Sequence, residues 1–356
     1  MKKSLHLVLV LIVTLLVGCN KNEDEVSDFN VTLDVQYEDT FEGIIYPSFL
    51  YSSASLQGLD EESDFFEFKI NSNRSFEGRI RVTNDKFIKE TVVSKNIKTG
   101  NNEFSFKLLW KFDNFVNITT PGYTHFKVEL MDKSNKVIAT KNIQLSYRGI
   151  NECVYAVKNS AGEVKQIYSF FASYVNEDSK LLDTFLSLTL TNHNKQYKSE
   201  PLLHLSSGWA GYQLGERYVF LQVLAIVNQL YKMGMQYSSI TDTSNAATKI
   251  YSQNVRFINE SLILQNANCV DGSVLLASIL EKIGIRCFLV TEPGHMYLAY
   301  SKTGKTEPDF SDLGFIETTS ISSGNFPTIF NDKIITNESL FISIRKAREA
   351  GIKPIQ

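Results

Sequence analysis

Apolar and polar residues alternate in short runs over the first part of the chain. Between about Phe29 and Arg148 these runs are separated by polar turns at Asn71-Ser72-Asn73, Thr99-Gly100-Asn101-Asn102 and Asp132-Lys133-Ser134-Asn135. A period of two is typical of strands with one buried face. The runs that predict strands are Asn30–Val35, Phe65–Ile70, Phe76–Val82, Phe104–Trp110, Phe126–Leu130 and Val137–Leu145. The pattern predicts an all-β sandwich over residues 29–150, of immunoglobulin-like topology.

The pattern changes after residue 150, and a second domain of α+β class is expected there. Residues 151–166 are expected to cross between the domains, 151–245 to form the helical part of the second domain, and 246–356 its core. A polar loop is expected from Asn192 to Glu200. Helical spacing predicts Tyr168–Tyr174, Leu181–Leu190 and Glu216–Met233 as helices, the last of them ended by Gly234.

The next predicted helix begins at a cysteine. If Asn268 is the N-cap, Asp271 is the third helical residue and the two form a capping box. Cys269 is then the first helical residue, where free N–H groups and the positive end of the helix dipole stabilise a thiolate. Residues 274–283 are apolar on nearly every side, which indicates a buried helix, and Gly284 ends it.

Strands are predicted on both sides of this helix. Lys249–Ile258 precedes it, and Ile285–Thr291, His295–Tyr300 and Phe315–Thr319 follow it. Glu292-Pro293-Gly294 forms a tight turn, and Lys302 to Asp312 a polar hairpin. Adjacent antiparallel strands would place His295 beside Glu317 if both side chains point towards the helix. The histidine would then take the thiol proton, and the carboxylate would orient the imidazole.

Each of these residues also has an ordinary structural interpretation. A cysteine at a helix start is usually a small buried residue, and a histidine after Pro-Gly is usually a turn residue. Glu317 could pair with a cation such as Arg286. The combination of a cysteine helix, a histidine strand and an acid strand favours the functional interpretation of Cys269, His295 and Glu317.

The N-terminus has the features of an export signal. Lys2 and Lys3 precede an apolar run from Leu5 to Val17 that is too short for a membrane-spanning helix. The run ends in Leu-Val-Gly before Cys19, which resembles the lipobox of bacterial lipoproteins. That resemblance implies cleavage after residue 18 and acylation of Cys19, for instance with palmitate. Residues 19–28 are an acidic tether, similar to the export signal of surface lipoproteins in Bacteroidetes-type bacteria, so the expected location is the outer membrane, facing outward.

Composition excludes several classes of function. The formal net charge is −3 with no basic stripe, which argues against nucleic-acid binding. Apart from Cys19 the cysteines are Cys153, Cys269 and Cys287, an odd number that leaves at least one thiol free; we expect Cys153 and Cys287 to be reduced and buried. The remaining histidines show no metal spacing and the glycines no nucleotide-binding loop, so no metal or cofactor is predicted; those histidines include His125, His193 and His204.

Residues 252–319 resemble bacterial transglutaminase-like proteins of the papain-type superfamily. The resemblance rests on Asn-Cys-Val-Asp-Gly at 268–272, Pro-Gly-His at 293–295 and Ile-Glu-Thr-Thr at 316–319, with a looser likeness at 170–178 and 237–241. It implies Cys269 as nucleophile, His295 as base and Glu317 as the orienting acid.

Some positions depart from the family pattern. The acid that orients the histidine is usually Asp in this family, so Asp309 and Asp312 are alternative candidates to Glu317. The Thr two positions after the acid and the aromatic residue two positions after the histidine are present here as Thr319 and Tyr297. For the oxyanion hole the resemblance suggests the N–H of Cys269 and, as a further candidate, the amide of Gln253.

Two functions are compatible with these features. The first is an enzyme that forms a thioester at Cys269 with a protein or peptide substrate, more readily for hydrolysis than for crosslinking. The second is an inactive transglutaminase-like scaffold whose β-sandwich binds a glycan or protein. In the first case the sandwich is a spacer that lifts the enzyme from the membrane.

Overall fold

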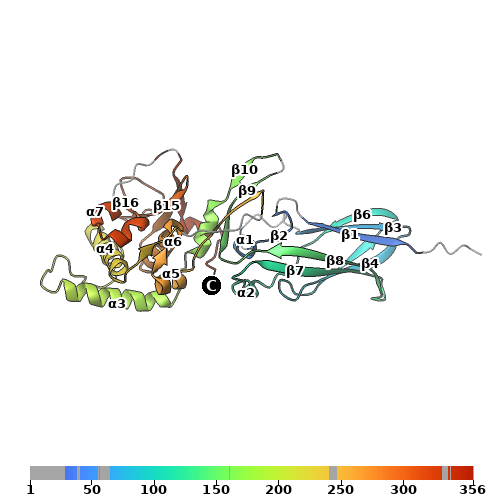
Figure 1. Ribbon diagram of the computed structural model, residues 1–356, viewed down its shortest axis with the longest axis horizontal. Helices are drawn as coiled ribbons and strands as arrows, with labels where there is room; N and C mark the ends of the chain where they lie inside the picture. The colour runs from blue at the N-terminus through green and yellow to red at the C-terminus, as the bar shows by residue number, and fades with distance from the viewer. Residues whose placement is uncertain are drawn as a thin grey trace, which may run out of the picture.

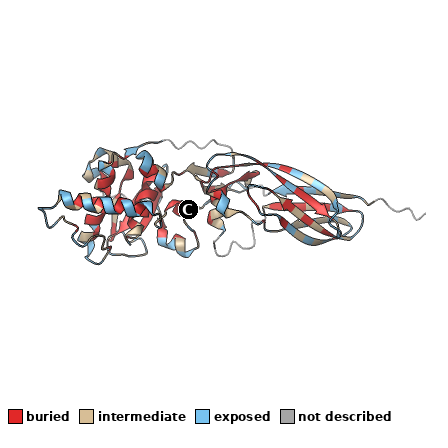
Figure 2. Ribbon diagram, turned by 90° about the horizontal axis from the view of Figure 1, so that it is seen from below, coloured by how far each residue is buried: buried red, intermediate tan, exposed pale blue. Residues whose placement is uncertain are grey.

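The computed structural model describes residues 29–37, 41–54, 56, 65–159, 161–239, 247–330, 336 and 338–355. The predicted signal peptide, Cys19 and the tether lie outside the described residues. The molecule is elongated, with two β-sheets at one end and a mixed helix and sheet region at the other (Figure 1). Buried residues run along the middle of both ends (Figure 2).

Two sheets form the N-terminal part. The larger has the order β2-β8-β7-β4-β5 and the smaller the order β1-β3-β6; all neighbours are antiparallel except β2 and β8. Phe66 of the smaller sheet packs edge-on against Phe126 of the larger, with ring centroids 5.3 Å apart. The strands are β1 (Val31–Tyr37), β2 (Ile44–Ile45), β3 (Phe66–Ser72), β4 (Phe76–Thr83), β5 (Thr91–Ile97), β6 (Gly100–Ser105), β7 (Gly122–Met131) and β8 (Val137–Tyr147).

Most strands predicted in this part are present, and the immunoglobulin-like topology stays a prediction. The predictions around β6 were wrong: Gly100-Asn101-Asn102 is the start of β6, not a turn, and the strand predicted over Phe104–Trp110 ends at Ser105, with Trp110 in an isolated bridge to Ile88. The side chain of Asn102 accepts the N–H of Lys98 at 2.9 Å and donates to its carbonyl at 2.8 Å. Asn102 thus stabilises the preceding turn while its backbone pairs with Ile70 of β3.

A hairpin joins the two parts of the molecule. We expected 151–166 to be a connection, but it forms β9 (Glu152–Lys158) and β10 (Val164–Gln166), and β9 also pairs with β12 (Ile250–Asn254). The buried carboxylate of Glu152 holds this junction, since it pairs with Arg148 Nε at 2.6 Å and accepts the Ser252 hydroxyl at 2.7 Å. The short helices α1 (Pro47–Ser53) and α2 (Phe112–Phe115) lie at the inner end of the two sheets (Figure 1).

The C-terminal part is built on an antiparallel sheet of order β16-β15-β14-β17. Helix α6 (Cys269–Lys282) packs on it, and its residues Val270–Leu280 are all buried, as the apolar pattern predicted. Met296 and Leu298 of β15 join the core that α6 contributes to, whereas Tyr297 belongs to a separate cluster. The strands are β14 (Cys287–Glu292), β15 (His295–Ser301), β16 (Leu313–Ile316) and β17 (Leu340–Ser343).

The other helices surround α6. They are η2 (a 3₁₀ helix, Tyr168–Tyr174), α3 (Leu181–Gln196), α4 (Glu216–Lys232), α5 (Ile258–Leu264), η3 (3₁₀, Thr318–Ser323), α7 (Phe326–Ile329) and α8 (Ile344–Glu349); two short strands, β11 (Gln236–Tyr237) and β13 (Asn266–Ala267), pair in parallel. Helix α4 ends as predicted, with Gly234 at φ +85°. The predicted loop at Asn192 was wrong, because α3 continues to Gln196. Asn192 and Asn194 bond to Gln229 and Leu205 there, so tertiary partners satisfy polar side chains that otherwise favour a loop.

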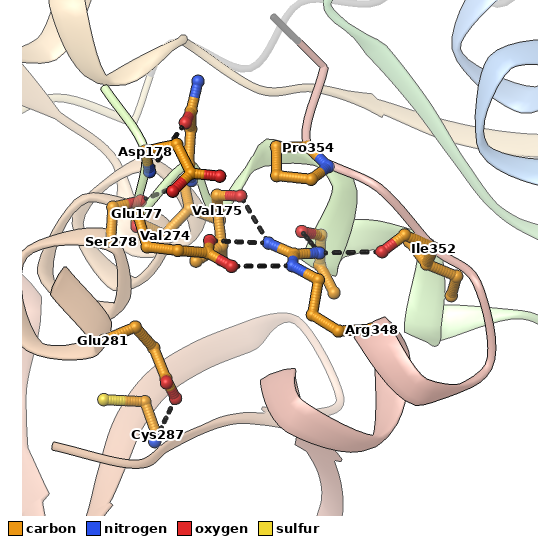
Figure 3. Close-up of polar contacts among 12 residues, drawn as sticks. Val175, Glu177, Asp178, Val274, Ser278, Glu281, Cys287, Arg348, Ile352 and Pro354 are labelled. Atoms are coloured by element: carbon orange, nitrogen blue, oxygen red, sulfur yellow. Dashed lines mark hydrogen bonds and ion pairs between the residues drawn. The ribbon is translucent and has the colours of Figure 1, made fainter. Parts of the chain in front are cut away.

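The C-terminal helix is fixed by one arginine (Figure 3). Arg348 pairs with Glu177 at 2.8 Å and donates to the carbonyls of Val175 and Ile352. The chain end returns to the junction, where the N–H of Ile355 bonds to the carbonyl of Ser173 at 2.8 Å.

Candidate active site

The start of α6 is fixed by the predicted capping box. Asn268 Oδ1 accepts the N–H of Asp271 at 2.8 Å, and Asp271 Oδ2 accepts the N–H of Asn268 at 3.1 Å. This prediction is confirmed. Cys269 is the first helical residue and is partly exposed, while Cys153 and Cys287 are buried; all three are free thiols, as expected.

Asp271 has a second partner that the sequence pattern did not indicate. Its carboxylate accepts the backbone N–H of Arg256 at 2.8 Å and pairs with the Arg256 guanidinium at 2.6 Å. Asp271 is only 1% exposed, so the arginine compensates a charge that would be costly to bury alone. The same carboxylate therefore caps α6 and ties it to the segment that follows β12.

His295 enters the site from the β14–β15 turn. Gly294 has φ +73°, which suits glycine in a tight turn, and Glu292 and His295 form the first strand pair after it. Hydrogen bonding with the Cys269 side chain and then with Glu317 raises the pKa of His295 to about 9. The imidazole is thus predominantly protonated at neutral pH beside the thiol.

Glu317 meets His295 from a turn rather than from a strand. Strand β16 ends at Ile316, and Glu317 is the N-cap of η3, which corrects the predicted strand. Glu317 Oε2 lies 2.9 Å from His295 Nε2, and its Oε1 accepts the Thr319 hydroxyl at 2.7 Å. The carboxylate is therefore held on both oxygens.

The condition that His295 and Glu317 both point towards the helix is not met by His295. His295 has the same strand parity as Tyr297, whereas Met296 and Leu298 join the core shared with α6. His295 interacts with Cys269 although it does not lie on the helix-facing side, because it is the first residue of β15 and stands at the end of that inner strand.

Close packing brings α6 to the turn that carries Glu317. A Cβ on Gly272 would lie 2.9 Å from the Cβ of Thr318, closer than two such atoms normally approach. Thr318 also donates to the carbonyl of Cys269 at 3.3 Å. Glycine at 272 therefore permits the contact that places Glu317 near the helix start.

Cys269 opens onto a cleft of about 460 Å³ that is lined by residues of β9, η2 and β12 and by the start of β15. Gln253, the predicted further oxyanion donor, lines this cleft with Cys269 and His295, and its role stays a prediction. The lining of this cleft also includes Tyr155, Tyr168, Phe171, Tyr237 and Glu292.

The rival acids are engaged elsewhere. Asp312 accepts the Ser301 hydroxyl at 2.5 Å and the N–H of Thr303 at 2.9 Å. Asp309 pairs with Lys305 at 2.5 Å. Both act within the hairpin that joins β15 to β16, which leaves Glu317 as the acid in contact with His295.

The described histidines outside the site lie in separate parts of the fold. His193 bonds to the carbonyl of Leu203 at 2.8 Å. Within the part of the chain that the structure describes, no group of three or more His, Cys, Asp or Glu residues could hold a metal ion.

Tyr237 is a site residue to which the sequence assigned no role. Its strand partner is Ala267, two residues before Cys269. Burial raises the pKa of Tyr237, and the charges of Cys269 and Glu317 raise it further, which indicates that the phenol lies near both. A two-residue strand carries no periodic signal, so only the fold could find this neighbour.

Comparisons with known proteins give no family assignment. No protein-family model matches the chain, and no curated protein matches it. Among the described helices none has the length and apolar character needed to cross a membrane.

Proposed function

We propose that Cys269, His295 and Glu317 are a catalytic triad of transglutaminase-like type that acts on an amide or peptide bond. The observation that carries this proposal is the 2.9 Å contact of Glu317 with His295, whose imidazole lines the same cleft as Cys269 at the start of a buried helix. A thiol with a positively charged imidazole beside it and a helix N-terminus behind it is the arrangement that activates cysteine nucleophiles.

The geometry supports a two-step acyl transfer. The Cys269 thiolate attacks the amide carbonyl carbon, and the N–H of Cys269, with the Gln253 amide, would bind the oxyanion. As the intermediate collapses, the C–N bond breaks, His295 gives its proton to the leaving amine, and a thioester remains. Water then loses a proton to His295 and attacks the thioester, which releases the acid and restores the thiolate–imidazolium pair.

The proposal includes the location of this chemistry. An acylated Cys19 would anchor the protein to the outer membrane, and the two N-terminal sheets, as an immunoglobulin-like sandwich, would hold the thiol site away from the lipid surface. The elongated arrangement of the two parts suits such a spacer (Figure 1). Hydrolysis is preferred to crosslinking on the family resemblance alone.

The first test is the pH dependence of iodoacetamide labelling at Cys269 in the wild type and in His295→Ala. We expect rapid labelling near pH 6, well below the usual thiol pKa of about 8.5, and loss of this fast reaction in the variant. Slow labelling that does not depend on His295 would contradict the proposal. Cys269→Ala should then abolish any acyl-enzyme seen by mass spectrometry with an amide or ester substrate.

A further inference from the structure

Three nearly parallel aromatic rings, the aromatic platform, line the cleft. The ring centroids of Tyr155, Tyr168 and Phe171 are 5.6, 5.8 and 6.4 Å apart, and their planes differ by only 6°, 18° and 13°. Nearly parallel rings at these distances are stacked with an offset, so the three side chains form one compact aromatic group. Phe171 is buried, while Tyr155 and Tyr168 keep exposed surface.

The platform comes from elements that carry none of the triad. Tyr155 lies on β9, Tyr168 and Phe171 on η2, and all three line the same cleft as Cys269. The aromatic surface therefore faces whatever substrate reaches the thiol.

The lining of this cleft also carries one carboxylate outside the triad. Glu292 Oε1 accepts the hydroxyls of Tyr297 and Ser339, each at 2.9 Å, and both donors are neutral. Among the described residues no cation pairs with Glu292, and neither lysine nor arginine lines the cleft. Glu292 is paired in register with His295, so its charge stands at the catalytic end.

We propose that the cleft selects substrates with a positively charged side chain next to the scissile amide, held between the Tyr155–Tyr168 platform and Glu292. This inference rests on the proposed thiol chemistry and names its substrate class. Aromatic faces attract ammonium and guanidinium groups, and an unpaired carboxylate at the same site adds charge complementarity. An anionic side chain would meet the Glu292 carboxylate, and neither lysine nor arginine lines the cleft to compensate it.

The test compares two affinity labels that differ by one charge. Acetyl-lysyl and acetyl-norleucyl chloromethyl ketones have the same four-carbon side chain, with and without the ammonium group. Each loses chloride to the Cys269 thiolate and leaves an S–CH₂ bond, so labelling rates can be compared by intact mass. We expect the lysyl label to react about tenfold faster, with a smaller ratio at high salt.

Variants locate the source of the preference. In Glu292→Gln the amide oxygen can still accept the Tyr297 hydroxyl, and the lysyl-to-norleucyl ratio should fall towards one. Tyr155→Leu should lower the same ratio. Glu307→Gln is the matched control. Glu307 lies on the exposed hairpin between β15 and β16 and pairs with Lys346, so this substitution should leave the ratio as in the wild type.

The outcomes separate this inference from the proposed function. Rapid, His295-dependent iodoacetamide labelling together with a wild-type ratio near one would overturn the substrate preference alone. An equal ratio in the wild type and in Glu292→Gln would likewise overturn it. Slow, His295-independent labelling would overturn the proposed function, and this inference with it.

Discussion

A cysteine and a carboxylate lie near each end of helix α6, in different surroundings. At the N-terminal end, Cys269 is partly exposed and interacts with His295, which Glu317 holds. Beyond the C-terminal end, Cys287 is 1% exposed, and its backbone N–H donates to Glu281 Oε1 at 2.7 Å (Figure 3). Burial raises the pKa of the Cys287 thiol, and the neighbouring Glu281 raises it further.

The comparison shows that a cysteine and an acid do not make a reactive site. At one end the helix dipole is positive, an imidazole lies between thiol and acid, and the thiol reaches a cleft. At the other end the dipole is negative, no base intervenes, and the thiol is enclosed. Three features therefore distinguish the two thiols: the sign of the nearby helix dipole, the histidine between thiol and acid, and the exposure of the thiol to a cleft.

The largest expected effect is the difference in alkylation between the Cys269→Ala and Cys287→Ala variants. Native protein treated with iodoacetamide at pH 6 should gain one adduct quickly; Cys269→Ala should lose it, and Cys287→Ala should keep it. We expect the alkylation rates of Cys269 and Cys287 to differ by about a hundredfold or more, measured by peptide mass spectrometry. Fast labelling of Cys287 in the folded protein would contradict the comparison.

Neutralising Glu317 should lower the pKa of His295. Hydrogen bonding to Cys269 and Glu317 raises that pKa from 6.5 to about 9, so the protonated form stabilises the fold. This contribution is fully present below pH 6.5 and is lost as pH rises through 9. In Glu317→Gln the titration of His295, followed by NMR, should shift to lower pH; an unchanged midpoint near 9 would show that Glu317 does not act on the imidazole.

Crowding the contact between α6 and η3 should have a smaller effect. Gly272→Ala would press its Cβ on Thr318, and overpacking of this kind costs about 1–3 kcal/mol, of which the helix preference of alanine offsets up to about 1 kcal/mol. Urea unfolding measures the loss, and the fast alkylation of Cys269 should slow as Glu317 moves. Thr318→Gly in the same chain removes the opposing atom, so the two changes should be non-additive.

The acid at the other end of α6 should give the smallest change. Burial raises the pKa of Glu281 from 4.5 to about 7, so the folded state binds more protons than the unfolded state between these values. Stability then falls as pH rises from 4.5 through 7. Glu281→Gln should remove this dependence and gain about 1–2 kcal/mol at pH 8, measured by urea unfolding at pH 5 and pH 8. Glu349→Gln, on the exposed face of α8, should keep the wild-type dependence.

Local sequence was sufficient for the elements that begin and end within one turn. The capping box of Asn268 and Asp271, the glycine that ends α4 and the tight turn before His295 each depend on residues two to four positions apart. The same holds for the strong alternation of β4 and β8. Such signals are complete within the segment, so these elements could be predicted without knowledge of what packs on them.

Only the tertiary structure decided the surroundings of the thiol. Glu317 lies at an N-cap because strand pairing ends at Ile316, and Tyr237 reaches the site through a two-residue pairing with Ala267. The Tyr155–Tyr168 platform lies in the same cleft as the thiol because β9 pairs with β12, about a hundred residues later in the chain. No periodicity encodes contacts between segments so far apart, because each segment fits several partners and the packed core selects one.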